Sequence, residues 1–262
     1  MRIRLPTLLA RLTVLLLLSG MGHEAAADEV GSARQSGYAH MSPATQAMQD
    51  DPSLNPATFW LLDGQVLWQD KAGPKNLSCA DCHGDAATSM KGVAARYPRM
   101  VEGKLTNLDG RLNLCRTIQQ QAPAFPYESK PLLSLAVYVG AQSRGMPIVV
   151  EQSPAIQDHL EAGRTAFYQR IGQLNLSCAQ CHAQRAGEKL AGNLIPQGHP
   201  TGYPIYRLEW QSVGSLQRRL RNCLAGVRAE PYAFGAKELL ELELFLNWRA
   251  QGMPMETPGV RP

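Results

Sequence analysis

The sequence predicts a mainly α-helical protein made of two tandem domains of the same design. Three observations lead to this prediction. The motif NLSCA-x-CH occurs twice, at 76–83 and 175–182. A helical pattern of apolar residues precedes each copy, and a second helical pattern follows each copy. Because the predicted elements follow the same order in both halves, we expect an internal duplication.

Residues 1–27 have the features of a secretory signal peptide. Three arginines precede a short apolar run, LTVLLLLSGM, and three alanines at 25–27 fit a cleavage site. The run is too short for a stable span, although an uncleaved anchor is the alternative, and no later segment is apolar for long enough. We therefore expect a periplasmic chain with no membrane span after cleavage. The small, polar residues 28–50 are expected to form an N-terminal arm, either disordered or wrapped around a partner.

The charge of the chain gives no sign of a nucleic-acid partner. The sequence contains 26 basic and 22 acidic residues. Removing residues 1–27 takes away three arginines and one glutamate, which leaves 23 basic and 21 acidic residues, a net charge of +2. Since no Lys/Arg-rich run is present either, we expect no binding to nucleic acid.

The first domain is expected over residues 51–150. A helix is predicted over 59–70, FWLLDGQVLWQD, ahead of the first motif. A second helix is predicted over 130–145, and the Gly-Met-Pro sequence at 145–147 ends it. A loop containing Tyr97-Pro98 and the segment RLNLC lie between the motif and this helix.

The second domain is expected over residues 151–262. Helices are predicted over 159–172 and 236–252, and another Gly-Met-Pro sequence ends the second of them. Between them lie a longer loop, Tyr203-Pro204 and the segment RLRNC. We place the boundary between the domains near 148–157, where Pro154 is expected to interrupt any continuous element.

The two C-x-x-C-H sequences, CADCH and CAQCH, are attachment sites for c-type haem. Two thiols add across the vinyl groups of the haem, and the adjacent histidine binds the iron from the same side. We therefore predict two covalently bound haem c groups, each wrapped by one half in an order that resembles a cytochrome c domain. The attachment residues are Cys79, Cys82 and His83, and Cys178, Cys181 and His182.

Two further cysteines, Cys115 and Cys223, stand between each motif and the last helix of its half. A cytochrome c domain places its distal iron ligand in this part of the chain. We therefore predict that each cysteine binds the iron as a thiolate opposite His83 and His182, which favours the ferric state and lowers the reduction potential. A disulfide between the two cysteines is the alternative, because export leads to an oxidising compartment.

The chain is similar to the SoxA family, the di-haem subunits of the SoxAX cytochromes of bacterial sulfur oxidation. The resemblance covers nearly all of the chain after residue 27. It depends on CADCH, CAQCH, Cys115 and above all RRLRNC followed by the last helix. It implies an L-cysteine S-thiosulfotransferase that works with a SoxX-type cytochrome subunit. Such an enzyme joins thiosulfate to a cysteine of a SoxYZ-type carrier and passes two electrons through haem to an acceptor cytochrome.

The resemblance also assigns roles to residues. It implies that the second haem is the active one, that Cys223 is its ligand and carries an extra sulfur as a persulfide, and that Arg219 belongs to the active site. The chemistry agrees, because a guanidinium offers a planar fork of donors for the thiosulfate dianion. On a helix, the spacing of four residues would put Arg219 and Cys223 on one face.

Several alternatives stay open on the sequence alone. Arg218, Arg221 and Arg228 either draw anions toward the site or form an ordinary solvated basic face. Arg111 precedes Cys115 by the same four residues, so only the resemblance assigns catalysis to the second half. A non-catalytic di-haem electron-transfer cytochrome is the alternative function, and a peroxidase-like di-haem protein is a further one.

Overall fold

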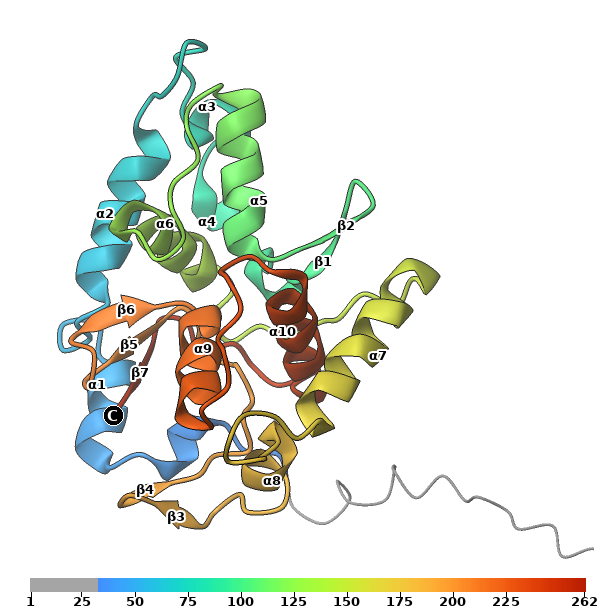
Figure 1. Cartoon of the computed structure of the whole chain (residues 1–262). Helices are drawn as coiled ribbons and strands as arrows, with labels where there is room; N and C mark the ends of the chain where they lie inside the picture. The colour runs from blue at the N-terminus through green and yellow to red at the C-terminus, as the bar shows by residue number, and fades with distance from the viewer. Residues whose placement is uncertain (1–32) are drawn as a thin grey trace, which may run out of the picture. The chain divides into compact units, whose positions relative to one another are not determined.

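The computed structural model describes residues 33–262, which form one compact unit. The predicted signal peptide and residues 28–32 lie outside the described residues. Helices dominate the described chain (Figure 1). The α-helices are α1 Pro43–Asp50, α2 Thr58–Gln69, α3 Cys79–His83, α4 Ala86–Ser89, α5 Leu108–Leu114, α6 Lys130–Ala141, α7 Pro154–Tyr168, α8 Cys178–His182, α9 Leu216–Gly226 and α10 Lys237–Arg249. Short 3-10 turns lie at Gly37–His40 and Ala94–Arg96, and a π-helical turn at Cys115–Gln119.

The strands are short and form three small sheets. Two are hairpins, one of β1 (Arg99–Val101) with β2 (Lys104–Thr106), and one of β3 (Lys189–Leu190) with β4 (Asn193–Leu194). The third has the order β6–β5–β7, in which β5 (Ile205–Arg207) runs antiparallel to β6 (Ser212–Gly214) and parallel to β7 (Gly259–Arg261). The third sheet therefore joins the C-terminal end of the chain to the loop that precedes α9.

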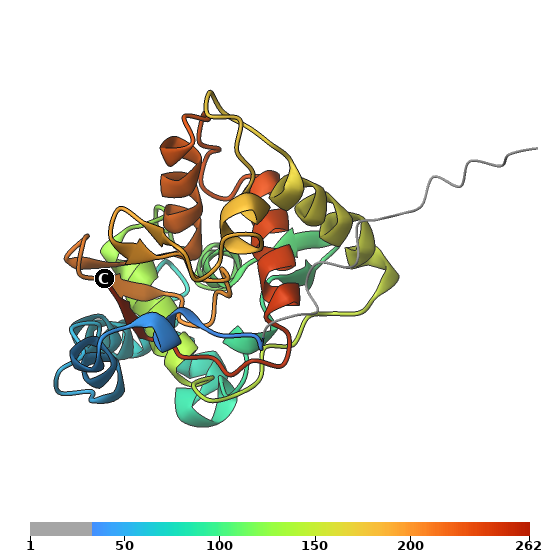
Figure 2. The same ribbon diagram turned by 90° about the horizontal axis from the view of Figure 1, so that it is seen from below.

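Each half is built on one pair of packed helices. Helix α2 packs against α6 in the first half, and α7 packs against α10 in the second, as Figure 2 shows for the second pair. Both pairs meet at a glycine of the first helix, Gly64 and Gly163, which lie at equivalent positions of the repeat. Their contact buries apolar side chains such as Leu133 and Val137 of α6, and Leu242 and Phe245 of α10. The predicted duplication is therefore visible in the helix packing.

The predicted helices agree with α2, α6 and α10 to within a few residues, but the fourth differs. Helix α7 begins at Pro154 and ends at Tyr168, whereas the prediction was 159–172. Pro154 occupies the first turn, where the missing backbone N–H costs no hydrogen bond. It therefore starts a helix instead of interrupting the chain.

The two Gly-Met-Pro sequences pair with each other across the middle of the described chain. Pro147 and Pro254 form an antiparallel bridge. The Ile148 N–H donates to the Met253 carbonyl at 2.9 Å, and the Met255 N–H donates to the Met146 carbonyl at 2.9 Å. Ile148 is buried, so the segment between the halves is part of the core. Within 33–262, no helix combines the length and the apolar character that crossing a bilayer requires.

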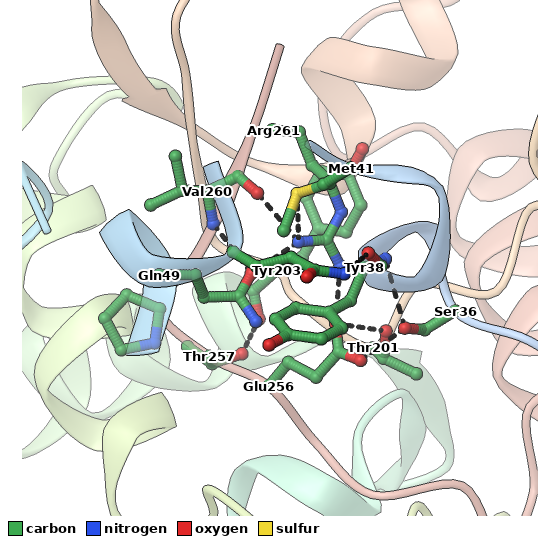
Figure 3. A network of polar contacts seen from close by, with 12 residues as sticks. Ser36, Tyr38, Met41, Gln49, Thr201, Tyr203, Glu256, Thr257, Val260 and Arg261 are labelled. Atoms are coloured by element: carbon green, nitrogen blue, oxygen red, sulfur yellow. Dashed lines mark hydrogen bonds and ion pairs between the residues drawn. The ribbon is translucent and has the colours of Figure 1, made fainter. Parts of the chain in front are cut away.

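Residues 33–50 are folded onto the body of the same chain, whereas the prediction was an arm that is either disordered or wrapped around a partner. The Ser42 hydroxyl caps α1 by accepting from the Thr45 N–H at 3.2 Å. Figure 3 shows how a polar network fastens this segment to the C-terminal strand. Gln49 bonds to the Val260 N–H at 3.0 Å and to Arg261, which also pairs with Glu256. Glu256 in turn accepts from Thr201, in the loop that leads to Tyr203.

Candidate haem and sulfur site

Each C-x-x-C-H motif forms a short helix, α3 or α8, that is capped by the serine before it. The Asp81 N–H donates to Ser78 Oγ at 3.0 Å and the Ser78 N–H donates back to Asp81 at 2.8 Å. Ser177 and Gln180 repeat this reciprocal capping in α8. The serine and the variable residue of NLSCA-x-CH therefore have a structural role. The cap sets one helical turn on which both cysteines and the histidine share a face.

A tight turn holds each motif against the helix that carries the lone cysteine. In the second half, the Leu174 N–H donates to the Val227 carbonyl at 3.3 Å, directly after α9. Gly172 has a φ of +68°, and a Cβ there would lie 2.1 Å from the same carbonyl oxygen. Gly73 has the equivalent contact with the Gln120 carbonyl in the first half. Only glycine fits these two places, which explains why the turn repeats in the sequence.

The structure places Cys223 beside the second motif. Burial and then the nearby Cys223 thiol raise the pKa of Cys178 to about 11. His182 is held by a hydrogen bond of 2.7 Å between its Nδ1 and the Pro196 carbonyl. Nδ1 must be the donor in this bond, so Nε2 is the nitrogen that stays available to a metal. No disulfide joins Cys115 to Cys223, so the structure does not support that alternative.

Arg219 and Cys223 both lie on α9, one turn apart. Arg219 is close enough to Tyr203 that its charge acts on the phenol: burial raises the pKa of Tyr203, and Arg219 and Arg207 lower it. Arg207 is itself mostly buried, and burial lowers its pKa. Its Nε has no hydrogen-bond partner within residues 33–262, although one amino group pairs with Glu209 at 2.9 Å. A buried guanidinium donor of this kind is suited to an anionic group.

Arg249 also belongs to this site, and the sequence analysis missed it. It lies in the last turn of α10, where its Nη1 donates to the Gln197 carbonyl at 2.8 Å. Its guanidinium lies 4.6 Å from the centre of the Phe167 ring. Burial lowers the pKa of His182, the hydrogen bond to Pro196 opposes this, and the charges of Arg219 and Arg249 lower it further. The sequence did contain a signal for Arg249. Arg249 stands three residues before the second Gly-Met-Pro, and the residue at the same place before the first Gly-Met-Pro is the uncharged Gln142.

The first half repeats this arrangement around Cys115. Burial raises the pKa of Cys115, Arg111 lowers it, and the Cys82 thiol raises it. Burial and then Cys115 raise the pKa of Cys79 to about 11, so the lone cysteine lies beside its own motif. The ring of Trp68 lies 5.8 Å from that of His83. One difference is local: the helix becomes π-helical at Cys115, whereas α9 continues through Cys223.

The other arginines of RRLRNC have partners of their own. Arg218 lies 4.4 Å from the centre of the Trp210 ring and 4.0 Å from Glu128. The guanidinium of Arg221 lies 4.5 Å from the centre of the Phe234 ring. These contacts favour a structural role for Arg218 and Arg221 over the predicted alternative of an anion-attracting entrance. Arg219, by contrast, forms no ion pair with any residue in 33–262.

A buried polar cluster between the two halves is a second feature that the sequence analysis did not predict. Asp109 of α5 and Glu243 of α10 are both buried. Burial and then Glu128 raise the pKa of Asp109 to about 7, and burial and then Asp109 raise that of Glu243 to about 8. The Asn107 amide donates to both oxygens of Glu243 at 3.2 and 3.3 Å. A cavity of about 80 Å³ adjoins the cluster and is also lined by Tyr97 and Tyr203.

The donor set fits covalently bound haem. Each motif offers two thiols and one imidazole from a single helical turn, and a third thiol lies nearby. In the second half the buried Nε of Arg207 lacks a partner among the described residues, as expected of a donor reserved for a propionate or another anion. The hydrogen bond to Pro196 also fixes the His182 tautomer that metal binding needs.

Comparison with known proteins agrees with this geometry. A model of the SoxA/TsdA cytochrome c domain matches residues 63–148 and 162–255. The chain is 34% identical over 229 residues to the L-cysteine S-thiosulfotransferase subunit SoxA of Rhodovulum sulfidophilum, covering 87% of this chain and 80% of that one. The same subunit of Pseudaminobacter salicylatoxidans is 35% identical over 230 residues, covering 86% and 80%. The crystal structure of SoxXA from P. pantotrophus matches with a TM-score of 0.84 and 31% identity, covering 87% of both chains.

These matches confirm the predicted fold class, mainly α with cytochrome c-like domains, and the prediction that the cofactor is covalent haem c. The domain model matches once in each half, around the two helix pairs already described. The relatives cover nearly the whole described chain and carry one and the same name. This chain therefore belongs to the SoxA/TsdA cytochrome c family and, within it, to the SoxA subunits.

Proposed function

We propose that this chain is the haem-bearing subunit of a periplasmic L-cysteine S-thiosulfotransferase. Its partner would be a SoxX-type cytochrome, as in the SoxXA complex to which it is similar. The substrates would be thiosulfate and a cysteine of a SoxYZ-type carrier protein. Export would depend on residues 1–27. Two haem c groups would be bound per chain, through Cys79 and Cys82 and through Cys178 and Cys181, and His83, Cys115, His182 and Cys223 would hold their irons.

One observation carries this proposal: Arg219 and Cys223 share α9 beside the second motif, and two more arginines surround them. The three guanidinium groups, of Arg207, Arg219 and Arg249, make the site positive. Thiosulfate is a dianion, and a guanidinium fork binds its oxygens with two parallel hydrogen bonds. Arg219 would hold the sulfonate end, which leaves the outer sulfur of thiosulfate facing Cys223.

The overall reaction is an oxidation. The carrier thiol and thiosulfate form a sulfur–sulfur bond, one proton leaves the thiol, and two electrons leave the pair. Haem c, when bound, accepts electrons and passes them to an acceptor cytochrome. Arg219 would position the anion, and helix α9 would keep Cys223 beside the reacting sulfur. Cys223 would carry the transferred sulfur during the reaction.

The test is turnover of the complex with its SoxX-type partner, the carrier and thiosulfate. In the Cys223→Ala variant we expect thiosulfate-dependent conjugation to be lost while both haems stay attached, as measured from the haem content per chain. Undiminished conjugation in that variant would leave a plain electron-transfer cytochrome as the better account.

A further inference from the structure

The N-terminal segment contacts the loop that holds the histidine of the second motif. The Gln35 N–H donates to Gln197 Oε1 at 2.7 Å, and Gln197 Nε2 donates to the Ala33 carbonyl at 3.5 Å. Gln197 directly follows Pro196, whose carbonyl accepts from His182 Nδ1 at 2.7 Å. The N-terminal segment is therefore bonded to the residue next to the group that orients this imidazole.

A closed ring of hydrogen bonds holds Gln197 by its side chain and by its backbone. Arg34 Nη1 donates to the carbonyls of Arg249, at 3.2 Å, and Gln251, at 2.7 Å. The carbonyls at the end of a helix have no partner within the helix, so Arg34 satisfies groups that α10 leaves open. Arg249 Nη1 donates in turn to the Gln197 carbonyl at 2.8 Å. The bond from Gln35 to Gln197 closes the ring, and α10 anchors it to the core through its packing on α7.

The backbone on either side of Gln197 lies directly against the imidazole of His182. Gly198 has a φ of +79°, and a Cβ at this position would lie 3.2 Å from His182 Cγ and 3.4 Å from its Nδ1. The ring is thus packed against one neighbour of Gln197 and hydrogen-bonded to the other, Pro196. Because this contact leaves no free space, a displacement of Gln197 shifts the carbonyl that the imidazole depends on.

The first motif has different surroundings. His83 is exposed, and the ring of Trp68 lies 5.8 Å from its own. The hydrogen bonds of residues 33–35 described above go to Gln197, Arg249 and Gln251, which belong to the second half. The N-terminal segment therefore acts on the histidine of one half, and the other half provides an internal reference.

We infer that Gln197 and residues 33–35 are positioning residues for His182 and thereby help to set the reduction potential of the second haem. This inference rests on the proposed binding of that haem's iron by His182. A firm hydrogen bond from Nδ1 to Pro196 makes the imidazole a stronger electron donor, which favours ferric iron and lowers the potential. Loosening the loop at Gln197 therefore raises the potential of this haem.

A redox titration of the haem-loaded protein tests this inference. The Gln197→Ala variant loses the bonds to Gln35 and Ala33 but keeps the backbone carbonyl that Arg249 needs. We expect the ferrous-to-ferric ratio of the second haem at a fixed potential to rise about threefold, less than the roughly tenfold effect of losing a direct partner of a metal ligand. Deletion of residues 28–35 should raise it at least as far, and serves as the second variant if Gln197→Ala does not fold. Gln197→Ala should add little to the deletion, because both changes remove the same bonds.

The controls separate this inference from the proposed function. Gln46→Ala is the matched control, because the Gln46 amide donates to the Tyr38 carbonyl at 3.0 Å, within the N-terminal segment itself. The Cys115→Met variant identifies the potential of the first haem. A rise confined to the second haem supports the inference. If Gln197→Ala and the deletion keep the wild-type potential, if the control shifts as far, or if both haems shift equally, the inference is wrong. Since the titration uses no substrate, a failure to conjugate thiosulfate would overturn the proposed function without changing this result.

Discussion

The helix crossing of the second half depends on Gly163, and replacing it by alanine should destabilise the protein. Gly163 lies on α7 where the helix meets α10. A Cβ at this position would be 2.0 Å from the Glu241 carbonyl oxygen and 2.9 Å from Phe245 Cβ. Cβ atoms essentially never approach other atoms closer than 3.0 Å. The two backbones would therefore have to separate by about 1 Å, through a core that is close-packed.

The size of the effect follows from two opposing contributions. Overpacking of a core costs about 1–3 kcal/mol, and here the atom in the way is a backbone oxygen that cannot rotate aside. Alanine in place of glycine within a helix regains about 1 kcal/mol. Because the obstructing backbone oxygen cannot move aside, we take the upper end of the overpacking cost, about 3 kcal/mol, and expect a net loss of about 2 kcal/mol. For a protein of this size, such a loss lowers the melting temperature by about 4–8 °C.

The assay is thermal unfolding of the haem-loaded protein, followed by circular dichroism. Gly226→Ala is the matched control, because this glycine ends α9 and a Cβ there meets nothing within 4 Å. We expect the control to melt at or slightly above the wild-type temperature. If Gly163→Ala melts as high as Gly226→Ala, the close crossing of α7 and α10 is wrong.

Three further predictions concern charge and ligation. Glu243→Gln should flatten the dependence of stability on pH, since folding raises the pKa of Glu243 from 4.5 to about 8. The folded chain then binds more protons than the unfolded one, so wild-type stability falls as pH rises between these values, and urea unfolding at several pH values measures the slope. A wild-type protein that grows more stable over this range contradicts the burial of Glu243. Arg219→Lys keeps the charge but loses the fork, and we expect the KM for thiosulfate to rise about tenfold; an unchanged KM rules out bidentate binding. Cys115→Met should leave the first haem attached and raise its reduction potential, as a redox titration would show, because a thioether donates less charge than a thiolate.

Much of the fold was predictable because the determining signals are local or repeated. The helical periodicity of 59–70, 130–145 and 236–252 corresponds to α2, α6 and α10. The repeat of NLSCA-x-CH reflects capping within one turn of helix. Likewise the spacing in RLRNC placed Arg219 and Cys223 on one helix face, because α9 is regular through both residues.

The features that the sequence analysis did not predict depend on contacts between segments that are distant in the sequence. Ser42-Pro43 is a favourable helix start, but the polar composition of 28–50 favoured the prediction of an arm. The segment is held in place by hydrogen bonds to residues 256–261, which are distant in the sequence. Glu243 lies in a helix with two other glutamates, which is typical of a solvated face, yet it is buried against Asn107 from the other half. Arg249 is brought to the second site by the packing of α10 on α7. No local pattern identifies Glu243 as buried, and only a comparison of the two halves, Gln142 against Arg249, distinguishes Arg249.

The most direct test of the central claim compares the two lone cysteines after exposure to thiosulfate. The complex with the SoxX-type subunit is incubated with thiosulfate and an acceptor cytochrome but without carrier, and the peptides containing Cys115 and Cys223 are weighed by mass spectrometry. We predict that the Cys223 thiolate of the wild type takes the outer sulfur of thiosulfate, whose sulfur–sulfur bond breaks with release of sulfite, so that the Cys223 peptide gains one sulfur. We predict no such addition on the Cys115 peptide, and loss of the modified Cys223 peptide in the Arg219→Gln variant. An unmodified Cys223 peptide, from a complex that conjugates thiosulfate at the full rate once the carrier is added, would contradict the role of Cys223 as the residue that carries sulfur.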